Sequence, residues 1–235
     1  MFVLNPQSND LEFPAVELAS NEGLLAIGGD LRVERLLQAY RQGIFPWYNE
    51  GQPILWWSPD PRAVLLPADL KIARSLRKTL RSGKFRVTFD QRFREVMRAC
   101  AGPRPNYPNG GTWITRDMLE AYVELHAHGY AHSVEAWHDD ELVGGLYGVA
   151  LGGAFFGESM FSRVPDASKV ALVSAVRQFA RWGYTLIDCQ LPSAHLERLG
   201  AASIPRGDYL ALLDAAIALP EHRAPWHFDS DLIIV

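Results

Sequence analysis

Residues 154–163, Ala-Phe-Phe-Gly-Glu-Ser-Met-Phe-Ser-Arg, and residues 184–190, Tyr-Thr-Leu-Ile-Asp-Cys-Gln, each join a short apolar run to a polar end. The apolar runs are rich in aromatic and β-branched residues and are bounded by Gly and Pro, which is typical of short buried strands. A helix is predicted between them over residues 167–182, and Gly183 is expected to end it. The two polar ends therefore follow neighbouring elements of one fold.

The polar residues at these ends are the first candidates for a functional site. Glu158, Asp188 and Gln190 lie where a carboxylate loses hydration and must be paired, hydrogen-bonded or protonated. Each of them alone is equally compatible with a side chain that faces solvent. Two such clusters separated by a helix favour a polar pocket at one edge of a sheet.

Composition indicates a soluble globular protein. The chain has 235 residues, of which 48% are hydrophobic, so it can bury a full core. Its longest apolar runs are much shorter than the ~20 residues needed to span a bilayer. The N-terminus lacks the pattern of a secretory signal, and Cys100 and Cys189, each beside apolar neighbours, favour reduced thiols over a disulfide. We therefore expect a cytoplasmic protein that does not bind membranes.

Charge is unevenly distributed along the chain. The net charge is −4, but the segment from Lys71 to Arg98 has ten Lys and Arg against two acidic residues, so it carries +8 and the remainder −12. Within it, Ile72, Leu76 and Leu80 have the spacing of the buried stripe of an amphipathic helix. The basic residues Arg74, Arg77, Lys78 and Arg81 share the exposed face. This face is either a phosphate contact or an ordinary solvated surface, and both interpretations remain open.

The chain divides into two parts by composition. Residues 1–66 are rich in Gly, Pro and Trp, and a short helix is expected before Gly43. Four prolines and three tryptophans in residues 46–62 predict an irregular segment rather than regular structure. From residue 67 onward, helices and strands alternate. We expect a small N-terminal α/β domain over 1–66 and a larger domain over 67–235.

The larger part is predicted to be α+β. Its expected elements are listed in chain order as a strand over 85–89, helices over 92–101 and 115–126, strands over 132–137, 141–151 and 154–161, the helix over 167–182, and a strand over 185–190. A polar loop is expected at 103–111, and Thr115 and Asp166 are the expected helix N-caps. The order from residue 115 resembles an acetyltransferase-like (GNAT) domain, with a mixed, mostly antiparallel sheet flanked by helices. Coenzyme A is disfavoured, because residues 162–169 lack the glycines that hold its pyrophosphate.

Other chemistries are disfavoured by spacing. His126, His128 and His132 cluster without a Cys or carboxylate that would complete a metal site. Residues 157–161 imitate a hydrolase nucleophile elbow but lack its last Gly. Neither a phosphate-binding loop nor a dinucleotide fingerprint is present. The sequence thus predicts no metal.

Six motifs resemble those of the leucyl/phenylalanyl-tRNA–protein transferase family. They are Gly-Leu-Leu-Ala-Ile-Gly-Gly-Asp-Leu at 23–31, Gly-Ile-Phe-Pro-Trp-Tyr at 43–48, Leu-Trp-Trp-Ser-Pro-Asp-Pro-Arg at 55–62, Gly-Thr-Trp-Ile-Thr at 111–115, Gly-Glu-Ser-Met-Phe-Ser-Arg at 157–163 and Ile-Asp-Cys-Gln at 187–190. The resemblance runs from about residue 13 to residue 209 in matching order. Two of these blocks are long and unusual, which makes a chance match remote.

The resemblance implies an enzyme. Members of the family move Leu or Phe, and less readily Met, from aminoacyl-tRNA onto proteins that begin with Arg or Lys, which marks them for degradation by the N-end rule. The ester is already activated, so no cofactor is expected. The implied partners are aminoacyl-tRNA and the acceptor protein, and we expect a monomer.

The resemblance also assigns expected roles at the centre. Asp188 and Gln190 would share a face if their strand stays regular, with Asp188 favoured for proton uptake and Gln190 for positioning the amine. Glu158 is a candidate to bind the cationic acceptor. Some relatives have an Asn where this chain has Ser193. Whether Asp188 acts as a base or only through its charge remains open.

Binding residues follow by position. The slot for the transferred side chain is expected among Leu146, Phe155, Met160, Ala175, Phe179 and Ile187, although ordinary core packing explains each of them as well. The tRNA 3′ end is expected to meet Trp47, Trp113 and Ser162, where either tryptophan could instead be plain core. The tRNA backbone is expected on Arg74, Arg77, Lys78, Arg81 and Lys84.

Two functions from other classes are alternatives to this one. A coenzyme A-dependent acetyltransferase would need pyrophosphate contacts from a connection without glycine. A non-catalytic RNA-binding module would use only the basic helix and would leave Glu158, Asp188 and Gln190 dispensable. Neither explains the long motif matches.

Overall fold

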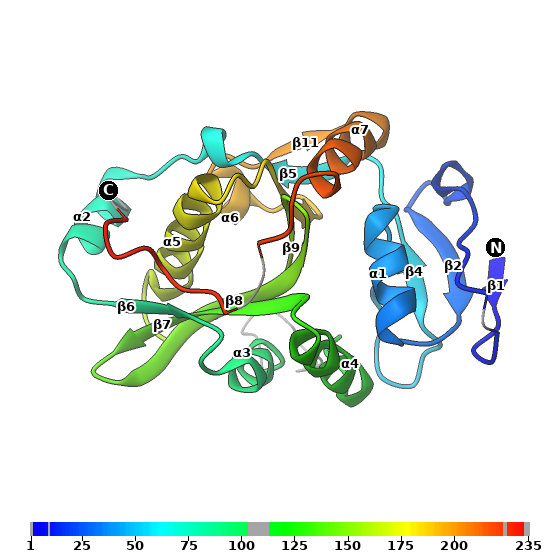
Figure 1. Cartoon of the computed structure of the whole chain (residues 1–235), viewed down its shortest axis with the longest axis horizontal. Helices are drawn as coiled ribbons and strands as arrows, with labels where there is room; N and C mark the ends of the chain where they lie inside the picture. The colour runs from blue at the N-terminus through cyan, green and yellow to red at the C-terminus, as the bar shows by residue number, and fades with distance from the viewer. Residues whose placement is uncertain (1, 9, 103–112, 223–224, 233–235) are drawn as a thin grey trace.

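A computed structural model describes residues 2–8, 10–102, 113–222 and 225–232. Two sheets with helices packed on them form the structure (Figure 1). The smaller sheet contains four strands near the N-terminus, and the larger contains seven. The expected α+β class is confirmed. No helix among the described residues is long and apolar enough to cross a membrane.

Within the part of the chain that the structure describes, one pair of strands in the seven-stranded sheet is parallel, and it carries the two polar segments. Strands β9 and β10 run parallel, and every other neighbouring pair is antiparallel. Helix α5 supplies the crossover that a parallel pair needs. In spatial order the strands are β11 (Ala202–Ile204), β5 (Arg62–Leu65), β10 (Leu186–Gln190), β9 (Ala154–Ser162), β8 (Glu141–Leu151), β7 (Ala131–His138) and β6 (Arg86–Phe89).

Helices cover both faces of this sheet (Figure 1). Helix α5 (Ala167–Arg181) packs on one face, with α2 (Arg74–Arg81) against it, and α3 (Phe93–Cys100) and α4 (Arg116–Ala127) pack on the other. Two further helices, the short α6 (Ala194–Glu197) and α7 (Arg206–Ile217), follow β10. The core is accordingly divided into two apolar clusters, one on each face.

The N-terminal part is more regular than its composition predicts. Its sheet has the order β1 (Phe2–Leu4), β2 (Leu24–Gly28), β4 (Leu55–Trp57) and β3 (Phe45–Pro46), and α1 (Val33–Arg41) lies between this sheet and the larger part (Figure 1). The prediction of irregular structure across 46–62 is therefore wrong for the short strands. Prolines are tolerated because β3 is an edge strand.

Strand β5 connects the two parts. All four of its residues are buried, and it pairs with β10 and β11 in the larger sheet. The expected division after residue 66 would leave this strand with the N-terminal part. That the two parts are separate domains stays a prediction. Because β4 belongs to the smaller sheet and β5 to the larger one, a boundary between these two strands fits the structure better.

Most of the local expectations are confirmed. The predicted strands and helices are present within two residues of their expected ends, and Thr115 caps α4 by accepting a hydrogen bond from the Met118 amide at 3.2 Å. Asp166 precedes α5, but its side chain makes no cap bond. Its carboxylate instead accepts hydrogen bonds from Lys169 and Thr79. The loop expected at 103–111 lies outside the described residues.

Two β-bulges interrupt the sheet at the candidate residues. In β9 the register against β8 shifts between Gly157 and Ser159, so Glu158 is the extra residue. In β10 the register against β5 shifts between Asp188 and Gln190. Bulges re-aim side chains and are frequent beside active sites. The condition under which Asp188 and Gln190 would share a face, a regular strand, is therefore not met.

Candidate active site

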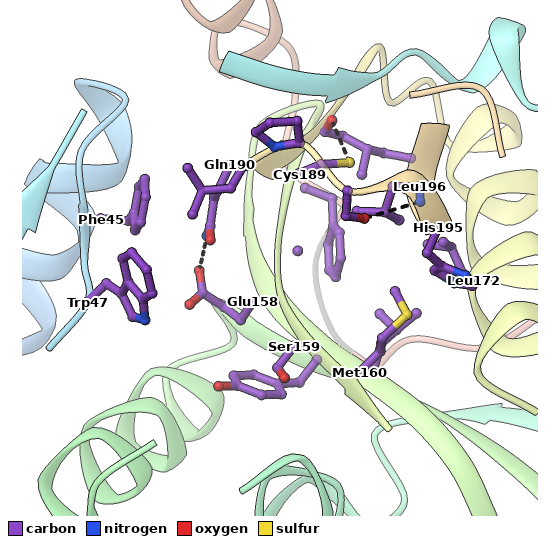
Figure 2. A pocket seen from close by; sticks show the side chains of 18 of the residues that line it. Phe45, Trp47, Glu158, Ser159, Met160, Leu172, Cys189, Gln190, His195 and Leu196 are labelled. Atoms are coloured by element: carbon purple, nitrogen blue, oxygen red, sulfur yellow. Dashed lines mark hydrogen bonds between the residues drawn. The ribbon is translucent and has the colours of Figure 1, made fainter. Parts of the chain in front are cut away.

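A pocket of about 450 Å³ opens beside the bulge of β9 and the end of β10. In Figure 2, Phe45 and Trp47 lie on one side and Leu172, Met160 and His195 on the other, with Glu158 and Gln190 between them. The residues that line the pocket come from both parts of the chain. They are Phe45, Pro46, Trp47, Trp113, Leu146, Tyr147, Phe155, Gly157, Glu158, Ser159, Met160, Leu172, Ile187, Cys189, Gln190, Leu191, Pro192, Ser193, His195 and Leu196.

Four of the six residues expected in the side-chain slot line this pocket: Leu146, Phe155, Met160 and Ile187. Phe155 and Met160 belong to the same apolar cluster although they are five positions apart. A regular strand would place them on opposite faces, and the bulge at Glu158 removes that difference. Leu172 of α5 completes the slot, and the sequence analysis missed it.

Ala175 and Phe179 are buried on α5 but do not line the pocket. Both lie on the same stripe as Leu172, three and seven residues further along the helix. Only the first turns of α5 reach the pocket. Phe179 lies instead in an aromatic cluster with Phe155 and Trp226.

Glu158 is held by groups from three elements. The Tyr40 hydroxyl of α1 donates to its Oε1 at 2.7 Å, the Tyr122 hydroxyl of α4 donates to its Oε2 at 3.2 Å, and Gln190 Nε2 donates to Oε1 at 2.8 Å. The pKa of Glu158 is raised to about 7, because burial, aided by the nearby charge of Asp188, outweighs the three hydrogen bonds that lower it.

The hydrogen bonds around Glu158 form a closed ring. The hydroxyls of Tyr40 and Tyr122 also bond to each other, so three bonds join two phenols and one carboxyl group. An ionised carboxylate leaves two protons for these three bonds. A protonated carboxyl supplies the third, by donating to one phenol instead of accepting from it, and that phenol then donates to the other. The ring is therefore complete only when Glu158 is protonated, which agrees with the raised pKa of this residue.

Asp188 is surrounded differently. It is fully buried, and Arg62 donates to both of its oxygens, from Nε at 2.8 Å and from Nη2 at 2.6 Å. The Gln190 amide donates to Oδ1 at 2.8 Å, and the Tyr209 hydroxyl donates to Oδ2 at 2.9 Å. Each carboxylate oxygen thus accepts two hydrogen bonds. Asp188 does not line the pocket.

Gln190 owes its direction to the bulge. Its backbone has a φ of 62°, in the left-handed region that few residues other than Gly adopt. The bond from its amide to Asp188 holds this conformation, and its side chain lies against Glu158. Glu158, Asp188 and Gln190 are therefore joined in one hydrogen-bond network. The side chain of Gln190 contacts Glu158, and its backbone amide contacts Asp188.

The expected tRNA contacts are divided between two places. Trp47 and Trp113 line the pocket. Ser162 lies outside it, and its hydroxyl donates to the Val164 carbonyl and accepts from the Ser168 amide. The expected backbone contacts, Arg74, Arg77, Lys78, Arg81 and Lys84, are exposed on and just after α2, also outside the pocket.

Sequence reasoning missed the partners of both carboxylates. In the sequence, Tyr40 looks like an ordinary buried residue on the apolar face of its helix. Tyr122 lies in a different helix, so no local pattern links it to Glu158. Arg62 carried one usable signal, because an arginine that begins the apolar run Ala63-Val64-Leu65 must find a buried anion. Among the described residues, no group of three or more His, Cys, Asp or Glu side chains could hold a metal ion.

Comparisons with known proteins agree on a family. Residues 64–214 match the model of the leucyl/phenylalanyl-tRNA protein transferase family, and residues 29–60 match its N-terminal domain. A leucyl/phenylalanyl-tRNA–protein transferase of Stutzerimonas stutzeri is 59% identical over 220 residues, 93% of this chain and 96% of that protein. The protein of the same name from Thiobacillus denitrificans is 57% identical over 227 residues, 96% of this chain and 99% of that protein.

Among solved structures, a GCN5-related N-acetyltransferase from Kribbella flavida matches with a TM-score of 0.35 and 12% identity, over 70% of this chain and 58% of that one. The family model covers well over half of the chain, and the two relatives match nearly its whole length. The chain therefore belongs to the leucyl/phenylalanyl-tRNA protein transferase family and is an aminoacyltransferase.

Proposed function

We propose that this protein transfers Leu or Phe, and less readily Met, from aminoacyl-tRNA to the N-terminal α-amine of proteins that begin with Arg or Lys. Such products would be marked for degradation by the N-end rule. The observation that carries the proposal is a single pocket that combines an apolar slot with a carboxyl group whose pKa is raised to about 7.

The apolar slot suits a side chain that is not branched at Cβ. Leu146, Phe155, Leu172 and Ile187 offer only hydrocarbon, and the flexible thioether of Met160 adapts to both Leu and Phe. Trp47 and Trp113 line the same pocket and present aromatic faces on which the terminal adenine of tRNA can stack. The exposed basic face of α2 then supplies phosphate contacts further along the tRNA.

The reaction is an aminolysis of an ester. The acceptor ammonium first loses a proton, and the free amine attacks the ester carbonyl carbon. A C–N bond forms, the C–O bond to the tRNA ribose breaks, and the second amine proton goes to the departing ribose oxygen. One proton is left over for each peptide bond formed, so the site needs a group that accepts it.

The geometry supports Glu158 as that acceptor. It lines the pocket, and its proton completes the ring with Tyr40 and Tyr122. Its negative charge before the transfer also attracts a cationic acceptor. Asp188 is less suited to proton uptake, because its oxygens already accept four hydrogen bonds and it lies outside the pocket.

Gln190 supports the amine. Its Nε2 donates to Glu158, which leaves its carbonyl oxygen to accept a hydrogen bond from the acceptor amine. The amine would then lie beside the hydrogen-bonded pair of Gln190 and Glu158, next to the ester carbonyl. Holding the two reactants in this way supplies the entropic part of the rate enhancement.

The test is a transfer assay with matched substrates. Purified protein is incubated with labelled Leu-tRNA, Phe-tRNA or Val-tRNA and a peptide beginning with Arg, or the same peptide acetylated at its N-terminus. We expect label in the free peptide from Leu-tRNA and Phe-tRNA, and none from Val-tRNA or in the acetylated peptide. Binding of tRNA without transfer would contradict the proposal and favour the RNA-binding module.

A further inference from the structure

Arg62 is the centre of the network behind the pocket. Only 1% of its surface is exposed, and it lies at the start of β5, next to β10. Burial by itself lowers the pKa of its guanidinium, but the charge and hydrogen bonds of Asp188, together with the nearby Tyr209 and Glu158, outweigh burial and the pKa is raised. The guanidinium is therefore a permanent cation whose directions of donation are set by its planar fork.

One side of the guanidinium holds the aromatic wall of the pocket. Its Nη1 donates to the Gly43 carbonyl at 3.1 Å, and its Cζ lies 4.8 Å from the centroid of the Phe45 ring. Phe45, Pro46 and Trp47 lie two to four residues after Gly43 and line the pocket. Gly43 has a φ of +70°, and a Cβ there would lie 2.7 Å from the Tyr209 ring, so this close approach requires glycine.

The other side of the guanidinium holds the polar wall. Arg62 fixes both oxygens of Asp188, and Asp188 Oδ1 in turn accepts the hydrogen bond from the strained Gln190 amide. Tyr209 of α7 supports the arrangement from outside, because its hydroxyl donates to Asp188 and its ring lies 4.6 Å from the guanidinium. Arg62 does not itself line the pocket.

We infer that Arg62 is a positioning residue that joins the two walls of the pocket, and that it sets the direction of Gln190 through Asp188. The inference rests on the proposed function, since Gln190 is taken there to hold the acceptor amine. The role needs the fork of an arginine. Lysine would keep the charge but could not bind both Asp188 oxygens and the Gly43 carbonyl in one plane.

A double-mutant cycle separates positioning from general stability. Transfer of Phe from Phe-tRNA to an Arg-starting peptide is measured in single turnovers at saturating aminoacyl-tRNA, for Arg62→Lys, Gln190→Ala and the double variant. Displacing a reactant-holding group slows reactions by about 10²-fold, and we expect that loss in Arg62→Lys. In the Gln190→Ala background, we expect Arg62→Lys to cost clearly less than in the unmodified protein, because the part of its effect that passes through Gln190 is already lost.

The matched control is Arg35→Lys. Arg35 is equally buried and donates to Asp30 at 3.1 Å, but it does not line the pocket or contact its network. We expect this variant to lose stability in thermal unfolding and to keep its transfer rate. The inference would be overturned if the rate loss in the double variant of Arg62 and Gln190 equalled the product of the two single losses.

A second variant covers the case in which Arg62→Lys does not fold. Tyr209→Phe removes one donor to Asp188 and keeps the ring beside Arg62. We expect a smaller loss of transfer rate that is again reduced in the Gln190→Ala background, and a loss that is undiminished there would contradict the inference. Failure of the unmodified protein to transfer would instead contradict the proposed function, so the two failures are distinguishable.

Discussion

Glu158 and Asp188 are buried carboxyl groups on neighbouring strands, yet their surroundings differ in nearly every respect. Glu158 lines the pocket and accepts hydrogen bonds from two phenols and one amide. Asp188 lies behind the pocket and is paired with Arg62 on both oxygens. Among the described residues, no cation is in direct contact with the carboxyl group of Glu158, whereas Arg62 neutralises Asp188.

This difference assigns the two groups to different tasks. A carboxyl group among neutral donors can change its protonation near neutral pH. A carboxylate bound on both oxygens by a buried guanidinium is instead held in a fixed geometry. Glu158 is therefore suited to exchange a proton during transfer, and Asp188 is suited to hold the shape of the site. The following experiments test whether the two tasks can be separated.

The largest expected effect is on the rate of transfer in Glu158→Gln. Glutamine keeps the size of the side chain but accepts no proton, and loss of a general base costs about 10²–10⁴-fold. In the unmodified protein the rate should rise with pH through about 7, because only ionised Glu158 accepts the proton. The variant should keep only the later rise from the acceptor amine, near pH 8. A rate that is level between pH 6 and 7.5 in the unmodified protein would contradict this role.

Asp188→Asn should affect stability most. The substitution leaves the guanidinium of Arg62 buried without its counter-ion, and breaking a buried pair in this way costs about 3–5 kcal/mol. Urea unfolding at pH 7 measures the loss. The control is Asp231→Asn, since Asp231 pairs with Arg181 at the exposed surface and its loss should change stability little. Equal effects of the two substitutions would remove the distinction between the carboxylates.

The pH dependence of stability should come from Glu158. Its pKa is about 7 when folded and 4.5 ordinarily, so between these values the folded protein binds more protons than the unfolded chain. The unfolding free energy should therefore fall as pH rises from 4.5 to 7, by an amount on the order of 3 kcal/mol, and then level off.

The same Glu158→Gln variant checks this dependence. Its unfolding free energy should match that of the unmodified protein near pH 4.5 and exceed it at pH 8, because the amide never ionises. Denaturation at a series of pH values gives the difference. A difference that does not vary with pH would show that the buried carboxyl of Glu158 is not the source.

The smallest expected effect concerns the apolar slot alone. Leu172→Ala lengthens the slot and should favour Phe over Leu by about tenfold, the usual value of a small change in a hydrophobic pocket. The pH profile should stay unchanged, because neither carboxyl is touched. Phe179→Leu is the control on the same helix, and it should lower stability without changing the preference, since Phe179 does not line the pocket. Equal shifts in preference from both variants would place the slot elsewhere.

The comparison of the carboxylates also separates what sequence could predict from what it could not. Local patterns predicted the strands that carry Glu158 and Asp188, the helix between them, and the cap at Thr115, because periodicity and capping depend on residues a few positions apart. The same patterns placed Glu158 and Gln190 at a common pocket. They did not predict the bulges, which depend on the register of neighbouring strands.

The sequence by itself determined the α+β class, the order of the elements and the family, because these depend on periodic patterns and on motifs that lie within short stretches of the chain. Only the tertiary structure decided which carboxyl is free to take a proton. Arg62 is 126 positions from Asp188, and Tyr40 is 118 positions from Glu158. The pKa of a carboxyl group depends on its burial and on partners that are distant in sequence, and these partners come into contact only when the chain folds.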